Sequence, residues 1–571
     1  MLLAFILFGC WLGYQALEVK SNLYAARDSA QQARDALSNV NVEEATKKAE
    51  NARRHAQNAR DTTHSLSWNL ASAVPWLGTP FTTGQQISDV VLGLATDVLT
   101  PSTQVAAAIS PDRLLEGGQV NVQLLRDAAP ELSKIAAAAT LLNAQAGKIS
   151  DPTYISAMSE ARTQLQAQIS ELSELLRNTD LAARLAPSML GADGRRTYFM
   201  GFQTNAEARG TGGLLGGFGI LHFDNGKASV DNLASNIALD DAFASVDLGP
   251  DFNQLYGTSR PTMDFRNSNQ SSHFPYAAQI WKSMWAQKSG MDVDGVIAVD
   301  PIALSYILEA MGPVTLPDGE TITTDNVVEL TESTIYARFP DDQLARKQYL
   351  QDVASKVVEH MTAGEVKSPR KLLDALGKAL TEGRIAVWSA SPEDQQLLEE
   401  TPLAHVVPDD PAPFAGVVIS NLGGNKLDYY LRPQIEYSAD GCAGETRKST
   451  VTVRLTNTAP EGLPDYAAIA SGYKTFAPYF PRSTNFAAVS LVATKGATLA
   501  AVVAKNEKVP FYVGKERGHP VFQVQVGIPP GKSIELSFLL SEPTSPGAPR
   551  VPVQPLVEKV TPIVSVPQCS K

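Results

Sequence analysis

Residues 196–223 read RTYFMGFQTNAEARGTGGLLGGFGILHF, and this stretch decides how the middle of the chain folds. Its apolar and aromatic ends predict strands at 196–203 and 214–223. The glycines between and within these strands allow positive φ angles and a close approach of neighbouring backbone. Asn205, Glu207 and Arg209 follow the first strand directly, so we expect them to cluster at its end with the glycines packed beneath.

Two interpretations of this polar, glycine-rich run stay open on the residues alone. Open α/β sheets place ligands at the ends of their strands, and Arg209 can pair with an anion. A tight hairpin that packs its glycines against a helix explains the same residues without a ligand. The run has neither the Gly-Lys-Ser/Thr of a Walker loop nor the strand-turn-helix setting of a GxGxxG dinucleotide site.

Strand and helix signals alternate from residue 195 to residue 422. They comprise a buried strand at 293–299 and helices at about 275–289, 301–311, 324–335 and 344–362. Interleaved strands and helices indicate an α/β domain over 195–422, with helices on the faces of a sheet.

Further cations and amides in this domain extend the candidate anion site. Arg266 and Asn269 lie in a polar loop before one predicted helix, and Arg346 and Lys347 open another. If these cations converge on Arg209, they form an anion pocket inside an acidic protein. If they do not converge, each is a surface charge.

The sequence offers little for a dedicated metal site. It contains seven histidines and three cysteines, with no HExxH or CxxC pair. Asp300 offers a carboxylate to a divalent ion, but Asp300-Pro301 is equally typical of a helix start. We therefore expect no resident metal and no cofactor.

After residue 426 the pattern changes to strands alone, separated by Gly, Pro and Asn turns. A β-sandwich over 426–571 fits this pattern. Cys442 lies near its start and Cys569 near its end, and the only other cysteine lies in the apolar first 17 residues. We expect a Cys442–Cys569 disulfide, which persists only outside the cytosol; two free cysteines are the alternative.

Residues 19–190 predict a helical stalk or bundle. Small apolar residues recur at intervals of three and four over 23–37 and again over 45–59. Asn41 followed by Glu44 is typical of a helix start, so the two stripes predict an antiparallel helical hairpin. Further helices are predicted at about 82–108, 111–146 and 152–186.

The segment 68–81 interrupts these helices with two tryptophans, two prolines and a glycine. Tryptophan at a boundary between apolar and polar surroundings suits a bilayer interface. A loop whose tryptophans fill the core of the helical domain explains the segment equally well.

Residues 2–17 are the most apolar segment of the chain, with Gln15 as their polar exception. We expect residues 1–18 to be an uncleaved single-pass membrane anchor, although a spanning helix usually has roughly 20 apolar residues. A buried terminal helix is the alternative, and the surroundings of Cys10 match a lipidation site poorly. The first basic residues follow the segment, which by itself favours a cytoplasmic body.

The overall composition is that of ordinary globular protein. With 571 residues, 44% of them hydrophobic and 19% charged, the chain has material for about three folded units and is neither collagen-like nor multi-spanning. Lys and Arg number 48 against 60 Asp and Glu, which gives a net charge of −12. This acidic excess repels a phosphate backbone, so we expect no nucleic-acid partner.

Several motifs follow one another along the chain: YFMGFQTNAEARGTGGLLGGFG from residue 198, NSNQSSHFPYAAQIW from 267, VDGVIAVDPIALSYILEAMGPV from 293, ARKQYLQDV from 345, NKLDYYLRPQIEY from 425 and VTVRLTNTAPEGLPDY from 451. Together they resemble the bacterial domain-of-unknown-function family 4012, which is common in actinobacteria, over about residues 20–570. The resemblance implies a membrane-anchored envelope protein with its body outside the cytoplasm, which together with the cysteine pair outweighs the charge count.

A more distant similarity is to the LytR-CpsA-Psr enzymes, which transfer glycopolymers from polyprenyl pyrophosphate to peptidoglycan with arginines and a metal-binding Asp. Residues 202–209 and 300–314 stand at comparable places, which implies a central α/β sandwich of that type. Asn205, however, stands where an Asp would hold Mg²⁺, and a neutral amide is a weaker ligand than a carboxylate. Either another acid such as Glu207 compensates, or the pocket binds without catalysing.

The sequence thus predicts an α+β multidomain protein and leaves two functions open. The first is a membrane-anchored, extracytoplasmic envelope protein that binds or scaffolds cell-wall glycopolymer or polyprenyl-phosphate-linked intermediates, with the membrane, envelope proteins or cell-wall polymer as partners. The alternative is a LytR-CpsA-Psr-like phosphotransferase, in which Arg209 and Arg266 hold pyrophosphate and an acidic residue holds Mg²⁺. Whether the chain is an enzyme stays open at this point.

Overall fold

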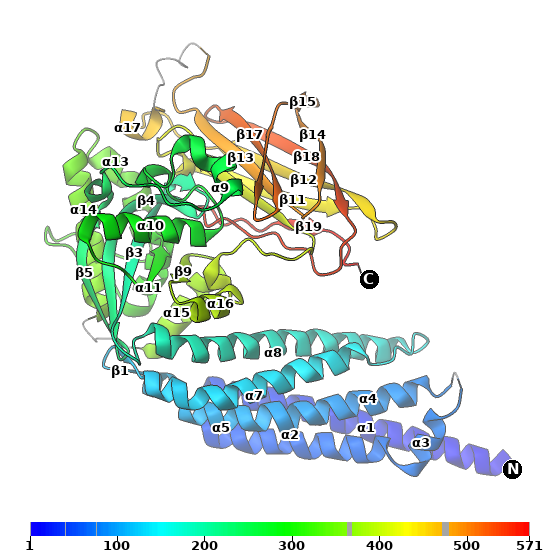
Figure 1. The fold of residues 1–571 in the computed structure, drawn as a ribbon. Helices are drawn as coiled ribbons and strands as arrows, with labels where there is room; N and C mark the ends of the chain where they lie inside the picture. Colours follow the sequence, from blue (N-terminus) through cyan, green and yellow to red (C-terminus); the bar gives the residue numbers. More distant parts are fainter. Residues whose placement is uncertain (1, 40, 76, 363–367, 471–478, 570–571) are drawn as a thin grey trace. The chain divides into compact units, whose positions relative to one another are not determined.

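The computed structural model describes residues 2–39, 41–75, 77–362, 368–470 and 479–569, except for the side chains of residues 2–6, 38 and 362. It combines helices and sheets in two compact units (Figure 1). The first unit comprises residues 1–116 and 120–194, and the second comprises residues 117–119 and 195–571. The first unit is helical, and the second contains the sheets described below.

The predicted helical hairpin is confirmed. α1 (Leu2–Ser38) and α2 (Val42–Thr63) lie side by side (Figure 1), and alanines such as Ala33 and Ala56 are fully buried between them. The α2 helix begins as expected, because the side chain of Asn41 accepts a hydrogen bond from the Glu44 amide at 3.2 Å. The segment predicted as an anchor, 1–18, is the beginning of α1 and is not separated from the hairpin. Residue 1 and the side chains of 2–6 lie outside the described part of that segment.

The helix predicted at 82–108 runs over Thr79–Ala108. In the described part of the chain it is the one helix long and apolar enough to cross a membrane, by length and composition. Its apolar residues have partners within the unit, because Ile87 packs against Ile169 and Val98 packs against Leu132. It is made of α4 (Thr79–Gly93), a π-helical turn η1 (Leu94–Leu99) and α5 (Thr100–Ala108).

The helix predicted at 111–146 is interrupted. The chain turns at Gly117 and Gly118, whose φ angles of 59° and 77° are incompatible with a right-handed helix. The remaining elements up to residue 194 are α3 (Leu66–Ser72), α6 (Pro111–Leu114), β1 (Leu115–Glu116), β2 (Gln119–Val120), α7 (Val122–Gly147) and α8 (Ser156–Met189).

The second unit contains a mixed sheet whose five longer strands run in the order β5-β4-β3-β6-β9. β3 and β6 are parallel, and the other neighbours are antiparallel. The three strands predicted here are confirmed, with β3 longer than expected. The bounds are β3 Arg196–Arg209, β4 Gly212–Asp224, β5 Lys227–Ser235, β6 Gly295–Val299 and β9 Ile385–Ser389.

The polar run 203–209 is part of β3 and does not form a loop beyond it. Its pairing with β4 is interrupted, and the amides of Ala206 and Ala208 donate to carboxyl groups instead. Glu332 Oε2 accepts the first of these hydrogen bonds at 2.5 Å, and Asp428 Oδ2 accepts the second at 2.8 Å. Because these carboxyl groups satisfy the backbone, β3 stays extended as far as Arg209.

Glycine is required where the β3–β4 hairpin closes. A Cβ atom at Gly210 would lie 2.1 Å from the carbonyl oxygen of Gln270. At Gly213 it would lie 2.3 Å from the carbonyl oxygen of Thr204. The close approach of backbone expected from the sequence is therefore confirmed at this turn.

Helices cover both faces of the sheet. α10 (Phe274–Ser289) packs Trp281 and Trp285 against Phe199 and Phe218 on one face. α11 (Pro301–Met311) and α14 (Gln343–Thr362) lie over the other face, beside Phe202 of β3. The other helices and strands of this domain are α9 (Pro250–Tyr256), β7 (Val314–Thr315), β8 (Thr321–Ile322), α12 (Val327–Glu329), η5 (Leu330–Thr334), α13 (Ile335–Arg338), α15 (Pro369–Thr381) and α16 (Pro392–Glu399).

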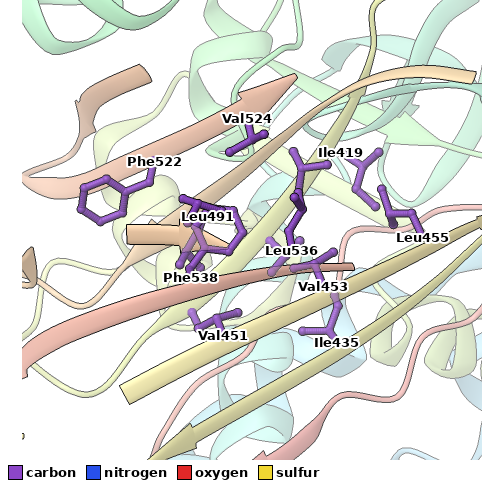
Figure 2. Close-up of a cluster of buried hydrophobic side chains, with 14 of the residues drawn as sticks. Ile419, Ile435, Val451, Val453, Leu455, Leu491, Phe522, Val524, Leu536 and Phe538 are labelled. Carbon is purple, nitrogen blue, oxygen red and sulfur yellow. The ribbon is translucent and has the colours of Figure 1, made fainter. Parts of the chain in front are cut away.

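The carboxyl-terminal part contains the predicted pair of sheets around one core. One sheet has the order β10-β13-β17-β16, and the other has the order β15-β14-β18-β12-β11-β19. Figure 2 shows side chains of both sheets in this core, including Leu491 and Phe522 of one and Val453 and Phe538 of the other. The bounds are β10 Ala415–Asn421, β11 Leu431–Ala439, β12 Thr446–Asn457, β13 Asn485–Ala493, β14 Thr498–Ala504, β15 Glu507–Val509, β16 Tyr512–Glu516, β17 His519–Ile528, β18 Ser533–Pro543 and β19 Ile563–Ser565, with a short helix α17 (Asp465–Ala468).

The sandwich begins earlier than predicted. β10 pairs with β13 over its whole length, so residues 415–421 belong to the sandwich and not to the α/β domain that was expected to extend to 422. The sequence did not reveal this boundary, because β10 is apolar on both faces and its pattern is typical of a strand in either domain. The α/β domain and the sandwich form one compact unit.

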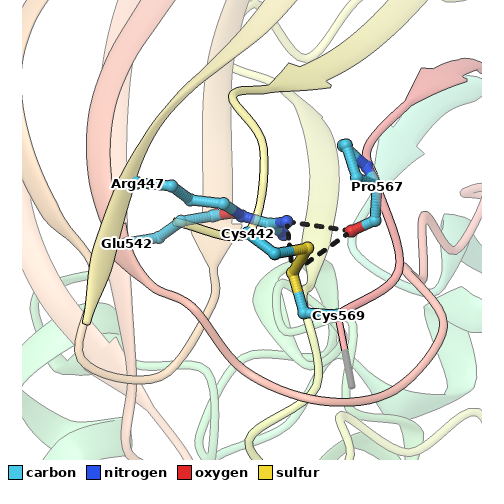
Figure 3. The surroundings of a disulfide bond; sticks show 5 residues. All are labelled: Cys442, Arg447, Glu542, Pro567 and Cys569. Carbon is cyan, nitrogen blue, oxygen red and sulfur yellow. Dashed lines mark hydrogen bonds and ion pairs between the residues drawn. A yellow bond between two sulfur atoms is a disulfide. The ribbon is translucent and has the colours of Figure 1, made fainter. Parts of the chain in front are cut away.

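The predicted disulfide is confirmed. Cys442 and Cys569 are bonded, with their Cα atoms 5.6 Å apart. Beside them, Arg447 pairs with Glu542 at 2.9 Å and donates to the carbonyl oxygen of Pro567 at 2.9 Å (Figure 3). A covalent bond and a buried ion pair together hold the last described residues against β12 and β18.

We predict that replacing both bonded cysteines with serine lowers the stability of the second unit. The bond closes a loop with a sequence separation of 127 residues. Closing a loop of this length restricts the unfolded chain and stabilises the fold by about 4 to 5 kcal/mol on the chain-entropy model. Urea unfolding followed by circular dichroism measures the loss. The control is Cys10→Ser, which removes the free cysteine, and equal unfolding midpoints for the two variants would contradict the prediction.

Candidate functional site

The end of β3 brings the three predicted residues Asn205, Glu207 and Arg209 onto one face of the strand, because side chains alternate along a strand. All three are buried. The segment near the carboxyl terminus covers them. Asn205 Nδ2 donates to the carbonyl oxygen of Pro555 at 2.6 Å, and Gln554 Nε2 donates to that of Arg209 at 2.6 Å.

Arg209 is held by protein groups at each guanidinium nitrogen. Nε donates to the carbonyl oxygen of Arg266 at 3.0 Å, and Nη1 donates to those of Ala208 at 2.9 Å and Asn421 at 3.3 Å. Nη2 donates to Glu207 Oε1 at 2.9 Å. This geometry favours a structural role for Arg209 over the ligand contact expected from the sequence.

Glu207 joins the two domains through a second cation. Its other carboxylate oxygen accepts a hydrogen bond from Lys426, which precedes the sandwich strand β11. Burial by itself would raise the pKa of Glu207, but Lys426 and Arg209 outweigh burial and hold the pKa below its ordinary value. For Lys426, burial acts to lower the pKa, and Glu207 raises it above the ordinary value.

Arg346 and Lys347 lie beside this ion pair. The Arg346 guanidinium stacks 3.9 Å from the centre of the Tyr466 ring, and the Lys426 ammonium lies 5.7 Å from the same ring. Burial lowers the pKa of Lys347 to about 8, and the positive charges of Lys426 and Arg346 act in the same direction. Lys347 therefore lies close enough to the other cations to feel their charge.

We call Glu207, Arg209, Arg346, Lys347 and Lys426 the Glu207 cluster. Among the residues that the structure describes, neither Arg346 nor Lys347 has a carboxylate within ion-pair distance. Arg346 Nη1 donates to the carbonyl oxygens of Phe339 and, at 3.0 Å, Pro340, and Lys347 Nζ donates to that of Gly216 at 3.4 Å. The cluster therefore has unpaired positive charge.

Glu332 adds a carboxyl group without adding negative charge at neutral pH. It is buried in η5 and accepts the amide of Ala206. Burial raises its pKa to about 8, although the hydrogen bond acts in the opposite direction. The protonated acid is therefore the main form at pH 7.

Two cavities adjoin the cluster. The first, of about 170 Å³, lies between η5–α13 and the sandwich side, and its polar lining includes Lys426, Glu332, Ser333 and Thr334. At its wall, Ser333 Oγ and the Tyr430 hydroxyl are 2.9 Å apart. A cavity of this volume holds several water-sized groups.

The second cavity, of about 80 Å³, lies between the sheet and the helices α11 and α14. Its walls are mainly apolar, and they include Phe202, Leu304 and Val353. Lys347 and Asp300 are charged residues in its lining. Lys347 thus joins an apolar cavity to the Glu207 cluster.

Two predicted site residues lie elsewhere. Arg266 is about half exposed and pairs with Asp240 at 2.8 Å and Asp264 at 3.2 Å, so its charge is already matched at the surface. Asn269 is buried in the hairpin turn, where its Nδ2 donates to Thr211 Oγ1 and to the Gly213 carbonyl oxygen, both at 2.7 Å. Of the predicted cations, Arg209, Arg346 and Lys347 belong to the Glu207 cluster, and Lys347 is the one that lines a cavity.

Asp300 takes the helix-start role that the sequence left open. Its Oδ1 accepts the Ala303 amide at 2.9 Å, and its Oδ2 pairs with Arg384 at 3.0 Å. Burial raises the pKa of Asp300, although Arg384 acts against this rise. Within the described ranges, no group of three or more His, Cys, Asp or Glu side chains is arranged to hold a metal ion.

Sequence reasoning missed Lys426, Glu332 and Tyr466. Lys426 lies in the motif NKLDYY and Tyr466 in the motif that ends LPDY, and both motifs were recognised without any role for these residues. Glu332 lies in a predicted helix without any unusual pattern. All three residues are far from Glu207 in the sequence, and no local pattern indicated that they lie near it in the fold.

Residues 193–336 match the model of a family described as a protein of unknown function, DUF4012. No curated protein matches the chain. The DUF4012 segment supplies Glu207, Arg209 and Glu332, whereas Arg346, Lys347 and Lys426 follow it. The Glu207 cluster is therefore built by the DUF4012 segment together with the chain that comes after it.

We predict that Arg209→Met destabilises the protein strongly. The change leaves Glu207 with one cation and leaves buried carbonyl oxygens without a donor. Breaking a buried ion pair from one side costs about 3 to 5 kcal/mol. Urea unfolding measures the effect, and Arg266→Met is the matched control, because this exposed arginine should change stability little. Equal losses for the two variants would show that Arg209 does not support the fold.

We predict that Glu332 makes stability depend on pH. In the unfolded chain the group ionises near its ordinary pKa of 4.5, whereas in the folded chain it keeps its proton up to about pH 8. The folded state therefore binds more protons in this window, so stability falls as pH rises from 4.5 to about 8.

The variant Glu332→Gln tests this, because glutamine resembles the protonated acid and does not ionise. The free energy of unfolding, measured in urea at several pH values, should fall less steeply in the variant than in the unchanged protein. Parallel curves for the two proteins would show that Glu332 ionises in the folded state at its ordinary pKa.

Proposed function

We propose that this protein is a membrane-anchored, extracytoplasmic envelope protein whose second unit binds the phosphate group of a polyprenyl- or sugar-linked cell-wall intermediate. The observation that carries the proposal is the positive charge of Lys347, which lines the apolar cavity and, among the described residues, has no carboxylate within ion-pair distance. Arg346 is its neighbour in α14, and Lys426 lines the other cavity. Unpaired cations at a partly buried site favour an anion, because charge-assisted hydrogen bonds are strongest where water is excluded.

The surroundings of Lys347 support a ligand that is both apolar and charged. This residue lines a cavity with mainly apolar walls, and it also lies close enough to Lys426 and Glu207 to feel their charges. A polyprenyl phosphate combines the same two properties. The larger cavity offers the ammonium of Lys426 and several hydroxyl groups, which suit phosphate or sugar oxygens.

The proposal is for binding without group transfer. The acids near the cluster already have partners: Glu207 pairs with two cations, Asp300 pairs with Arg384, and Asp428 accepts three hydrogen bonds. Asn205 donates to backbone at the place where the LytR-CpsA-Psr enzymes would hold Mg²⁺. A phosphotransferase would need one of these acids to exchange its partner for a metal ion or an acceptor hydroxyl.

The extracytoplasmic location rests on the disulfide and the amino-terminal segment. A structural disulfide such as Cys442–Cys569 is rare in the cytosol and common in secreted domains. The apolar residues at the start of α1 supply the membrane attachment in this proposal. The partners that it implies are the membrane, envelope proteins and cell-wall polymer.

We predict that Lys347→Met weakens binding of a polyprenyl phosphate by the equivalent of about 1.5 to 3 kcal/mol, the contribution of a hydrogen bond to a charged group. Isothermal titration calorimetry with the full chain and the lipid in mixed micelles measures the affinity. Because the pKa of Lys347 is about 8, binding to the unchanged protein should weaken as pH rises from 7 to about 9. The variant should lack this pH-dependent step.

The matched control is Lys356→Met on the same helix, α14, where the lysine is partly exposed and pairs with Glu359. This variant should bind as the unchanged protein does. Equal affinities for the Lys347 and Lys356 variants, with both proteins folded, would refute the phosphate site. Hydrolysis or transfer of the phosphate group by the unchanged protein would favour the phosphotransferase instead.

A further inference from the structure

The short helix α3 and the turn after it expose an apolar surface. Leu66, Leu70, Val74 and Leu77 are 78%, 58%, 44% and 62% exposed, and we call these four residues the α3 patch. The opposite side of α3 is buried, since Trp68 is 4% exposed and contacts Phe81. Trp68 therefore fills the core, as one of the two interpretations expected for the tryptophans of this segment, whereas Trp76 lies outside the described residues. The leucines of the same segment face outward.

The α3 patch is tied to the beginning of α1. The indole nitrogen of Trp11 donates to Ser67 Oγ at 3.2 Å. Gln15 Nε2 donates to Ser65 Oγ at 3.0 Å, and Ser67 Oγ donates to Gln15 Oε1 at 2.8 Å. These contacts explain why a glutamine interrupts the apolar segment 2–17. They also hold α3 beside residues 11–15 of this segment.

The helix α1 also exposes apolar side chains at the level of α3. Leu7, Trp11, Tyr14 and Leu17 are all more than half exposed, and the rings of Trp11 and Tyr14 stack at 5.8 Å. Tryptophan and tyrosine are enriched where a protein meets the headgroup region of a bilayer. The two exposed apolar surfaces therefore adjoin each other within one unit.

The charge pattern of the sequence points to a lipid surface. Residues 65–88 contain no Asp, Glu, Lys or Arg. An exposed surface that meets water or a polar partner usually has such residues, whereas one buried at the boundary of headgroups and acyl chains does not need them.

The geometry agrees with an interfacial position. An α-helix rises 1.5 Å per residue, so Trp11 lies about 9 Å along the helix axis from Leu17, the last residue of the apolar segment. Interfacial helices bury their apolar face about 5 to 10 Å into the boundary of headgroups and acyl chains. If the segment 2–17 enters a bilayer, its hydrogen bonds carry α3 to that depth.

We propose that the α3 patch is a second membrane contact, which lies in the lipid surface beside the start of α1. The inference rests on the membrane attachment proposed above, and it adds that the helical unit meets the bilayer along α3 as well as through α1. The α3 patch would contact the region of a lipid bilayer where headgroups meet acyl chains.

The test uses the full chain with Cys10→Ser, so that one engineered cysteine takes a polarity-sensitive NBD label. One variant has Leu70→Cys in the α3 patch. The matched control has Leu175→Cys on α8, because Leu175 is 59% exposed and Leu70 is 58% exposed. Both proteins are reconstituted into vesicles of phosphatidylethanolamine and phosphatidylglycerol, and flotation in a density gradient measures membrane attachment.

The label at position 70 should emit at shorter wavelength than the label at position 175. Doxyl-labelled lipids should quench it at least about twofold more, as expected for a group at the bilayer interface. If the protein floats but both labels are equally exposed to water, the α3 patch is not a membrane contact and the anchor stands. If the protein does not float, both the anchor and the α3 patch are refuted. Shielding at position 70 that grows with the number of protein copies per vesicle, without lipid quenching, would instead assign the patch to a second copy of the chain.

Discussion

The structure of the second unit depends on the buried carboxylate of Glu207. It binds Arg209 of its own strand and Lys426 of the segment that enters the sandwich, so one side chain links the α/β domain to the two-sheet domain. Removing either cation from water without this partner would be strongly unfavourable. The long β3 strand, the interrupted β3–β4 pairing and the adjoining cavity all lie around this ion pair, and the unpaired cations gather at its edge.

The sequence predicted well wherever local pattern determines structure. The alanine stripes predicted the first hairpin, Asn41 and Glu44 located the start of its second helix, and the two cysteines outside the first helix predicted their bond. Among the site residues, the motif around Arg346 and Lys347 was recognised as cationic, and these two residues approach Glu207. Each of these predictions used the chemistry of residues that lie close in sequence or are few in number.

The remaining features depend on contacts between distant parts of the chain. The predicted strand ends at residue 203 because the residues that follow are polar, yet the carboxyl groups of Glu332 and Asp428 satisfy their backbone and keep them extended. In the sequence, Arg266 was as suitable for binding an anion as Arg346 was, but in the structure Arg266 forms ion pairs with two aspartates. The apolar strand β10 fits either domain by pattern, and its partner strand decides which one it joins. A single sequence does not encode such pairings in its local pattern.

The contacts of Gln554 and Pro555 have a consequence for the biosynthesis of the protein. Gln554 donates to the backbone of Arg209, and Pro555 accepts from Asn205, across 345 and 350 residues of sequence. Glu207 and its neighbours therefore cannot be fully enclosed until nearly the whole chain has been synthesised. Until then, polar groups of β3 stay open to water in the α/β domain, and the Cys442–Cys569 bond forms near the end of assembly. The strand β3 is therefore synthesised early but is fully enclosed only when residues 554 and 555 reach it.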